Sequence, residues 1–192
     1  MALKLTPSQT VGPYFSMCLS GPGQDELVPP VHPGRVRIVG RVYDADREPI
    51  DDALVEIWQA DAHGRFRHPA DPRREPPHDP GFRGFGRASI DPSTLEFSFF
   101  TVKPGRVPSP DGALQAPHIG IIVQGRGMLR PLFTRLYFPD EAAANAGDFV
   151  LARVPEERRH LLVAGTVSDV TPPTYRFDVR LQGADETVFF DF

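Results

Sequence analysis

Hydrophobic and polar positions alternate along most of this chain after residue 35. Apolar side chains at every second position are typical of a strand with one buried face. The segments with this period are expected to be strands: 36–43, 53–59, 95–101, 118–124, 132–138, 161–167 and 175–182. Residues 186–192 are expected to add an edge strand. Short strands joined by links rich in Pro and Gly predict an all-β fold, a β-sandwich of mostly antiparallel strands.

Helical patterns are few. Residues 139–146 begin with Pro and two acidic residues and continue with Ala, which predicts one short helix. Residues 155–161 start with a Pro that suits the first turn of a helix and predict a second one. Two long links, 60–94 and 103–117, hold most of the unusual polar residues, and links of this length are usually functional or mobile.

The first 34 residues show no sustained period and contain repeated prolines. Proline fixes φ and removes a backbone donor, so neither a helix nor a central strand is expected there. The apolar side chains Val11, Tyr14 and Phe15 indicate that this segment docks on another surface. The sequence therefore predicts an extended N-terminal arm over 1–34, followed by a β-sandwich domain over 35–192.

Composition narrows the class of protein. The chain has 192 residues, 40% of them hydrophobic, which is enough for the core of one domain. Its formal net charge is -4, which argues against the basic surface of a nucleic-acid-binding protein. Cys18 is the single cysteine, so the chain forms no internal disulfide. With no secretory signal and no apolar run long enough for a bilayer, a soluble cytoplasmic protein is expected.

Histidines are the obvious candidates for a metal site, and they do not form a clear set. His118 begins a predicted strand, but Gly120, the next residue on the same strand face, has no side chain. His118 is therefore expected to be hydrogen-bonded or partly buried. His63, His68 and His78 lie among mixed charges in the first long link, which favours a solvated or subunit-facing loop over a metal site. No nucleophile and base stand in a recognisable pattern, so no catalytic residue is assigned.

Several motifs resemble the intradiol ring-cleaving dioxygenases. They are WQADAHGRFRH (58–68), TVKPGRVPSPDG (101–112) and APHIGIIVQGRG (116–127). The segments TPSQTVGPYF (6–15) and YRFDVRLQGADETVFFDF (175–192) resemble the alpha-type subunits of the two-chain members. The resemblance covers nearly the whole chain. It implies a β-sandwich and a part in the aromatic catabolism that cleaves 3,4-dihydroxybenzoate with O2 to 3-carboxy-cis,cis-muconate.

The same resemblance implies where ferric iron would bind. In the iron-bearing subunits of the family, two tyrosines and two histidines are the ligands, and the matching positions here hold Phe66, Val107, His118 and Gly120. Three of these residues have no donor atom, and one imidazole cannot hold a ferric ion that depends on phenolates. We therefore expect no metal on this chain, and the iron on a beta-type partner subunit.

The resemblance finally implies that an alpha-type subunit completes the substrate pocket of its partner. The matching positions are Thr10, Gly12, Pro13, Tyr14 and Arg126. Glycine and proline would shape a wall, tyrosine would add a ring and a hydroxyl, and arginine would attract a substrate carboxylate. The expected function is a non-catalytic subunit of a heteromeric oxidoreductase. The alternative is a stand-alone β-sandwich that binds small aromatic acids without activity.

Overall fold

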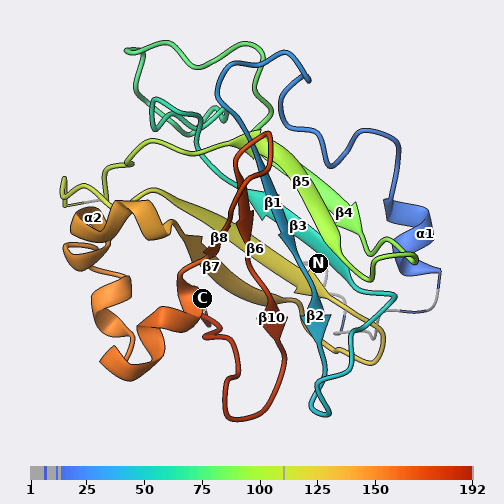
Figure 1. Ribbon diagram of the computed structural model, residues 1–192. Helices are drawn as coiled ribbons and strands as arrows, with labels where there is room; N and C mark the ends of the chain where they lie inside the picture. The colour runs from blue at the N-terminus through green and yellow to red at the C-terminus, as the bar shows by residue number, and fades with distance from the viewer. Residues whose placement is uncertain (1–6, 8–11, 13, 110, 192) are drawn as a thin grey trace, which may run out of the picture.

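The computed structural model describes residues 7, 12, 14–109 and 111–191. Two four-stranded sheets and one short two-stranded ladder form the body of the molecule (Figure 1). The first sheet has the order β5 (Phe97–Val102), β1 (Arg35–Gly40), β9 (Thr174–Arg176), β8 (Gly165–Val167). The second has the order β4 (Phe85–Ser89), β3 (Leu54–Trp58), β6 (His118–Gln124), β7 (Leu132–Tyr137). The ladder joins β2 (Val42–Tyr43) and β10 (Val179–Arg180).

Most strand pairs are antiparallel, as the sequence predicts. The exceptions among the named strands are β1 with β9 and β2 with β10, which run parallel. The all-β sandwich is therefore confirmed. No helix among the described residues has the length and apolar character needed to cross a bilayer.

The two large sheets share one hydrophobic core. Along β6 the burial alternates strictly, with Ile119, Ile121 and Val123 turned inward. Phe97 and Phe99 of β5 reach the same core from the first sheet and are fully buried. Burying a side chain of this size stabilises the fold by roughly 1.5–3 kcal/mol before the entropy cost. The alternate positions of β6 face outward, and the candidate site is formed on that face.

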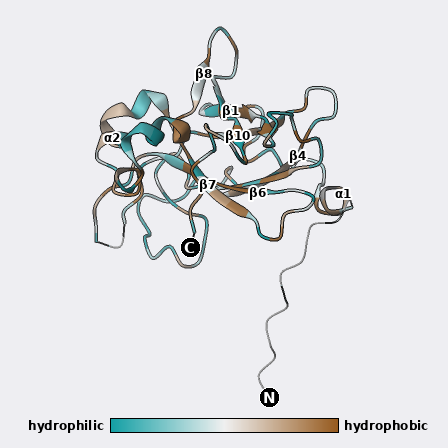
Figure 2. Ribbon diagram, turned by 90° about the horizontal axis from the view of Figure 1, so that it is seen from below, coloured by the Kyte–Doolittle hydropathy of each residue, from teal (hydrophilic) through white to brown (hydrophobic). Residues whose placement is uncertain are grey.

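Short helices flank the sandwich. Figure 1 shows α2 and the neighbouring helical turns on one side and α1 on the opposite side. The α-helices are α1 (Phe15–Leu19) and α2 (Ala142–Ala146); the 3₁₀ helices are η1 (Pro139–Glu141), η2 (Leu151–Arg153) and η3 (Glu156–Leu162). Figure 2 shows brown, hydrophobic stretches on β6 and β7 and mixed colours on the helical segments near α2. The helix expected over 139–146 is confirmed, and the one expected over 155–161 is a 3₁₀ helix.

A buried carboxylate joins these helical turns to the second sheet. Asp148 accepts hydrogen bonds from the backbone N–H groups of Ala116, Val150 and Leu151 and from the hydroxyl of Tyr137. Four donors around one fully buried carboxylate satisfy its charge. Asp148 thus fixes the start of β6 relative to the helical segment.

Five of the expected strands are found: 36–43, which is split at residue 41, together with 53–59, 95–101, 118–124 and 132–138. The prediction for 175–182 is confirmed as two short strands, β9 and β10. The prediction for 161–167 is wrong in its first half. Leu162 packs into a small second core from the 3₁₀ helix η3, and only Gly165–Val167 pair as a strand.

Four further differences from the predictions are found. Residues 186–191 form no named strand and make one isolated bridge, between Phe190 and Phe133. Strand β4 lies inside the link expected to be a loop, because its glycine-rich sequence hides the alternation. The arm contains the one-turn helix α1, which fits between prolines. Leu27 and Val28 also belong to the main core, although they precede the first large sheet.

Candidate functional site

A cavity of about 430 Å³ opens on the outer face of the second sheet. Its floor is the β6 segment that contains Gly120, and β3 and β7 form its sides. The two long loops cover it from above, through Phe66 and Val107. The side chains that determine its chemistry are Trp58, Phe66, Val107, Gln115, His118 and Arg135.

All four positions that the sequence matched to iron ligands meet in this cavity. Phe66, Val107, His118 and Gly120 line it together, although they come from three separate segments. The first, second and fourth carry no oxygen or nitrogen donor on their side chains. Among the described residues no group of three or more His, Cys, Asp or Glu side chains converges to hold a metal ion. The residues present therefore do not fit a ferric ion.

His118 is a structural histidine here. Its Nδ1 lies 2.8 Å from the carbonyl oxygen of Ala116, and its ring lies 5.9 Å from the ring of Tyr137. Burial, followed by the nearby charge of Arg135, lowers the pKa of His118 to about 4. The imidazole is neutral at pH 7, with Nδ1–H donating to the carbonyl and Nε2 left as an acceptor. The expectation of a hydrogen-bonded, partly buried histidine is confirmed.

Phe66 packs as an aromatic wall. Its ring is parallel to that of Trp58, with an interplanar angle of 4° and centroids 6.0 Å apart. His68 meets Trp58 edge to face, also at 6.0 Å. Such offset and edge contacts stabilise by about 0.5–1.5 kcal/mol each. They hold one side of the cavity flat and apolar.

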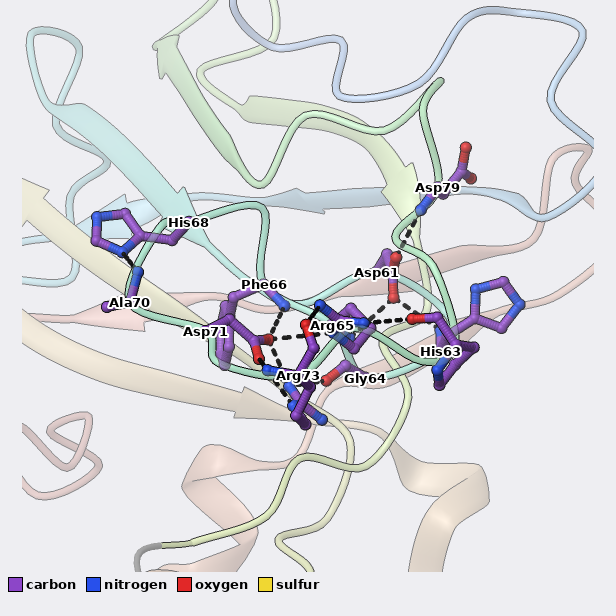
Figure 3. Close-up of polar contacts among 11 residues, drawn as sticks. Asp61, His63, Gly64, Arg65, Phe66, His68, Ala70, Asp71, Arg73 and Asp79 are labelled. Carbon is purple, nitrogen blue, oxygen red and sulfur yellow. Dashed lines mark hydrogen bonds and ion pairs between the residues drawn. The ribbon is translucent and has the colours of Figure 1, made fainter.

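A network of carboxylates fixes the loop that carries Phe66 (Figure 3). Asp61 is fully buried and accepts hydrogen bonds from the backbone N–H groups of His63, Arg65 and Asp79 at 2.8–2.9 Å. Asp71 accepts one from the backbone N–H of Phe66 at 3.0 Å.

Two arginines complete this network. Arg73 contacts both oxygens of Asp71, at 2.9 and 2.7 Å, and holds the pKa of that carboxyl well below its usual range. Arg65 lies 3.4 Å from Asp71 and also donates to the carbonyls of Arg73 and Pro76. The long loop is therefore rigidly held near the cavity.

The other histidines do not form a second site. His63 and His68 are exposed and point away from one another in Figure 3, and His78 is exposed as well. These positions fit the interpretation of a solvated or subunit-facing loop better than that of a metal site.

Arg135 is a cavity residue that the sequence reasoning missed. It stands on β7 directly opposite Gly120, and its Nη1 donates to Oε1 of Gln115 at 3.0 Å. No carboxylate of the described residues lies within ion-pair distance of it. In the sequence, the alternation of Arg135 with Phe133 indicated that both lie on one face of β7. Only the register between β6 and β7 shows that Arg135 lies opposite Gly120.

Of the predicted substrate-contacting residues, those that the structure describes do not line the cavity. Thr10 and Pro13 fall outside the described residues. Gly12 is exposed, and Tyr14 has 69% of its surface exposed. Arg126 lies just beyond the far end of β6 and does not line the cavity. At about 3.3 Å per residue, the two ends of that strand are roughly 20 Å apart.

The end of α1 and Arg126 lie at the same edge of the second sheet. This edge is formed by the ends of its strands, not by an outer strand. Leu54 pairs with both Gln124 and Ser89, so these three residues form a row across β6, β3 and β4. Ser89 is hydrogen-bonded to Ser20, which follows α1. Two strand spacings, about 10 Å, separate the ends of this row. The edge that carries Arg126 is thus the edge where α1 ends.

Comparisons with known proteins give one consistent result. A family model described as Dioxygenase matches residues 12–183. The protocatechuate 3,4-dioxygenase alpha chain of Burkholderia cepacia is 47% identical over 98% of both chains. The beta chain of the same organism's enzyme is 35% identical over 80% of this chain and 66% of its own length. A dioxygenase domain from Streptomyces sp. SirexAA-E has a similar structure, with a TM-score of 0.61, 25% identity and coverage of 93% and 100% of the two chains.

Proposed function

Because this chain belongs to the dioxygenase family, we propose that it is the alpha subunit of a protocatechuate 3,4-dioxygenase and binds no iron itself. The observation that carries this proposal is the cavity in which Phe66, Val107 and Gly120 stand beside a lone His118. A fold that keeps the cavity and lacks the donors is suited to support a metal centre on another chain. The 47% identity to an alpha chain over nearly full length disfavours a stand-alone binding module.

The proposed partner is a beta subunit, and the proposed reaction is the cleavage of 3,4-dihydroxybenzoate by O2 to 3-carboxy-cis,cis-muconate. The similarity of this chain to a beta chain, at 35% identity, supports a pair of related subunits. Ferric iron held by the beta subunit would make the ring reactive toward O2. This chain contributes shape, charge and exclusion of water, and no catalytic group.

The proposed contacts with substrate come from the arm and from the turn after β6. They are Thr10, Gly12, Pro13, Tyr14 and Arg126. The exposure of Tyr14 and Arg126 supports this role, since both side chains are available to a neighbouring subunit. The position of α1 and Arg126 at the same edge of the second sheet also supports this role, because one surface of the partner can contact both.

The proposed organisation is an arm over 1–34 and a sandwich domain over 35–192, with the arm anchored to the domain by Leu27 and Val28, which pack in its core. The arm would dock on the partner, and the domain would present the edge that carries Arg126. We place the complex in the cytoplasm, where the free thiol of the exposed Cys18 stays reduced.

Iron quantitation with and without the partner tests the proposal. The full chain is expressed alone, the beta chain alone, and the two together. We expect no stoichiometric iron on the lone chain, and an active complex with one ferric ion per heterodimer. One tightly bound ferric ion and full turnover on the lone chain would contradict the proposal, and so would two chains that fail to associate.

A further inference from the structure

We propose that the cavity on the second sheet is a binding site for a planar aromatic carboxylate, on this chain itself. It lies on β3, β6, β7 and the two long loops, and the proposal does not depend on the arm or on Arg126. Its volume of about 430 Å³ falls in the ~300–1,000 Å³ range of small-molecule sites. Its lining is mostly apolar, with a few polar groups gathered on one side.

The apolar side of the cavity selects a flat ring. Trp58 and Phe66 present parallel planes, and Phe133 and Ile122 line the same cavity from β7 and β6. These two residues are paired in register, so they form one continuous surface. Trp58 and Phe133 keep 37% and 36% of their surface exposed, which is costly for large apolar rings without a ligand. An aromatic ring stacked there would cover both.

The polar side selects an anion. Arg135 is the only Lys or Arg among the described residues that line the cavity, and neither Asp nor Glu lines it. Its guanidinium has neutral partners, the amide of Gln115 and the hydroxyl of Tyr137, and retains donors for a ligand. The Asp148 carboxylate, which accepts a hydrogen bond from the Tyr137 hydroxyl, is already satisfied by four donors. A ligand carboxylate would therefore meet, in a partly desolvated site, a guanidinium that has no ion-pair partner among the described residues.

His118 adds a preference for a hydroxyl group. Its Nδ1 is occupied by the carbonyl of Ala116, and no described residue donates to Nε2. A neutral imidazole in this state accepts a hydrogen bond and cannot attract a second anion. The preferred ligand is thus an aromatic carboxylate that also carries a ring hydroxyl.

Gly120 keeps the space for this ligand open. A Cβ at this position would lie 3.2 Å from the backbone oxygen of Trp58, a tight contact that a small shift of β3 must relieve, and would meet nothing else within 4 Å. The backbone has the ordinary extended conformation of β6, so no positive φ opposes a larger side chain. Substitution of Gly120 therefore fills the cavity, and the urea unfolding transition of the variant checks that it still folds.

Binding of 4-hydroxybenzoate to the full chain tests the proposal. Trp58 is the single tryptophan of the chain and lines the cavity, so its fluorescence reports occupancy, and calorimetry gives the stoichiometry. We expect saturable binding of one equivalent. Phenol lacks the carboxylate and cyclohexanecarboxylate lacks the flat ring. Each is expected to bind roughly tenfold more weakly or worse, since one charge-assisted contact or one stacking contact is lost.

Three variants locate the site. Arg135→Gln is expected to weaken binding roughly tenfold or more, and Gly120→Leu to abolish it. Arg130→Gln, an exposed arginine in the turn between β6 and β7, is the matched control and should bind like the wild type. Absence of saturable binding by the folded wild-type chain would overturn the proposal. Equal binding by Gly120→Leu and wild type, or an equal loss in Arg130→Gln and Arg135→Gln, would also overturn it.

The same titration on the two-chain complex gives an independent count. Gly120→Leu in this chain should lower the bound ligand by one equivalent per heterodimer. An unchanged count would mean that the cavity takes no ligand in the assembly and would refute the proposal. Failure of the two chains to associate would count against the proposed function alone, since the titration of the single chain stands by itself.

Discussion

Arg126 and Asp52 form an ion pair across the edge of the second sheet, with Nε of the arginine 3.1 Å from Oδ2 of the aspartate. The arginine side chain is 65% exposed, and the aspartate side chain is 24% exposed. An exposed pair of this kind contributes at most about 1 kcal/mol. Arg126 can therefore leave Asp52 at little cost and turn to a substrate carboxylate on a neighbouring subunit.

Replacement of Arg126 tests that role in the complex with a beta subunit. Arg126→Ala should raise KM for 3,4-dihydroxybenzoate roughly tenfold, since a charge-assisted contact is lost, and should change KM for unsubstituted catechol far less. Asp52→Asn is the matched control, because it frees the arginine and should leave KM unchanged or lower it. Steady-state kinetics with both substrates measure this. Equal changes for the two substrates would remove the carboxylate role.

Replacement of His118 should flatten the stability of the chain against pH. Burial lowers its pKa from the ordinary value of 6.5 to about 4, so the unfolded chain binds the proton more readily. Stability from the neutral imidazole is complete above pH 6.5 and is lost as pH falls toward 4, by roughly 3 kcal/mol. Urea unfolding of the wild type should show this loss, and His118→Gln should reduce it. The exposed His160→Gln serves as control and should keep the wild-type slope.

Replacement of Asp71 should loosen the loop that carries Phe66. The Arg73 contact lowers the pKa of Asp71, so its stabilisation is present above the unfolded value near 3.8 and fades as the pH falls below it. Asp71→Asn should cost roughly 3 kcal/mol at pH 7, because it leaves Arg65 and Arg73 without their carboxylate, and less at acid pH. Denaturant unfolding at several pH values measures both effects. Asp185→Asn, in an exposed pair with Arg47, should cost under about 1 kcal/mol; an equal loss in both variants would argue against the network.

Restoring the missing donor side chains should restore the binding of ferric iron. The triple variant Phe66→Tyr, Val107→Tyr, Gly120→His places two phenols and a second imidazole around the cavity that already holds His118. We expect it to bind ferric iron with the visible absorption of iron–phenolate bonds, while Phe66→Tyr alone binds none. Metal analysis and absorption spectra check this. A folded triple variant without iron would show that the cavity has lost the family's ligand geometry.

Much of this fold follows from local pattern. The strict alternation in His118–Gln124 predicted β6 with both its bounds, because one face packs on the core and the other does not. The run over 161–167 misled because Leu162 is buried from a 3₁₀ helix, and a short apolar run does not distinguish a strand from a helical turn. Strand β4 was missed because Gly84 and Gly86 interrupt the alternation that a strand normally shows.

The residues of the site also fall into those that the sequence could predict and those that it could not. Phe66, Val107, His118 and Gly120 could be matched to ligand positions by motif, and their meeting in one cavity followed from the shared fold. Arg135 could not be found this way, since its place opposite Gly120 depends on the register between β6 and β7. The ion pair of Arg126 with Asp52 is also a tertiary contact between distant segments, and no local period predicts it.

The cavity is lined by β6 from His118 to Ile122, whereas Arg126 lies beyond the end of that strand at Gln124, and this separation governs how substitutions combine. Changes at sites more than about 7–10 Å apart usually act additively, because they share no neighbours. A residue altered at Gly120 thus leaves Asp52 and Arg126 undisturbed, and the reverse holds. During evolution, the residues that line the cavity around Gly120 can therefore change. The surface around Arg126, which is proposed to contact a neighbouring subunit, stays the same.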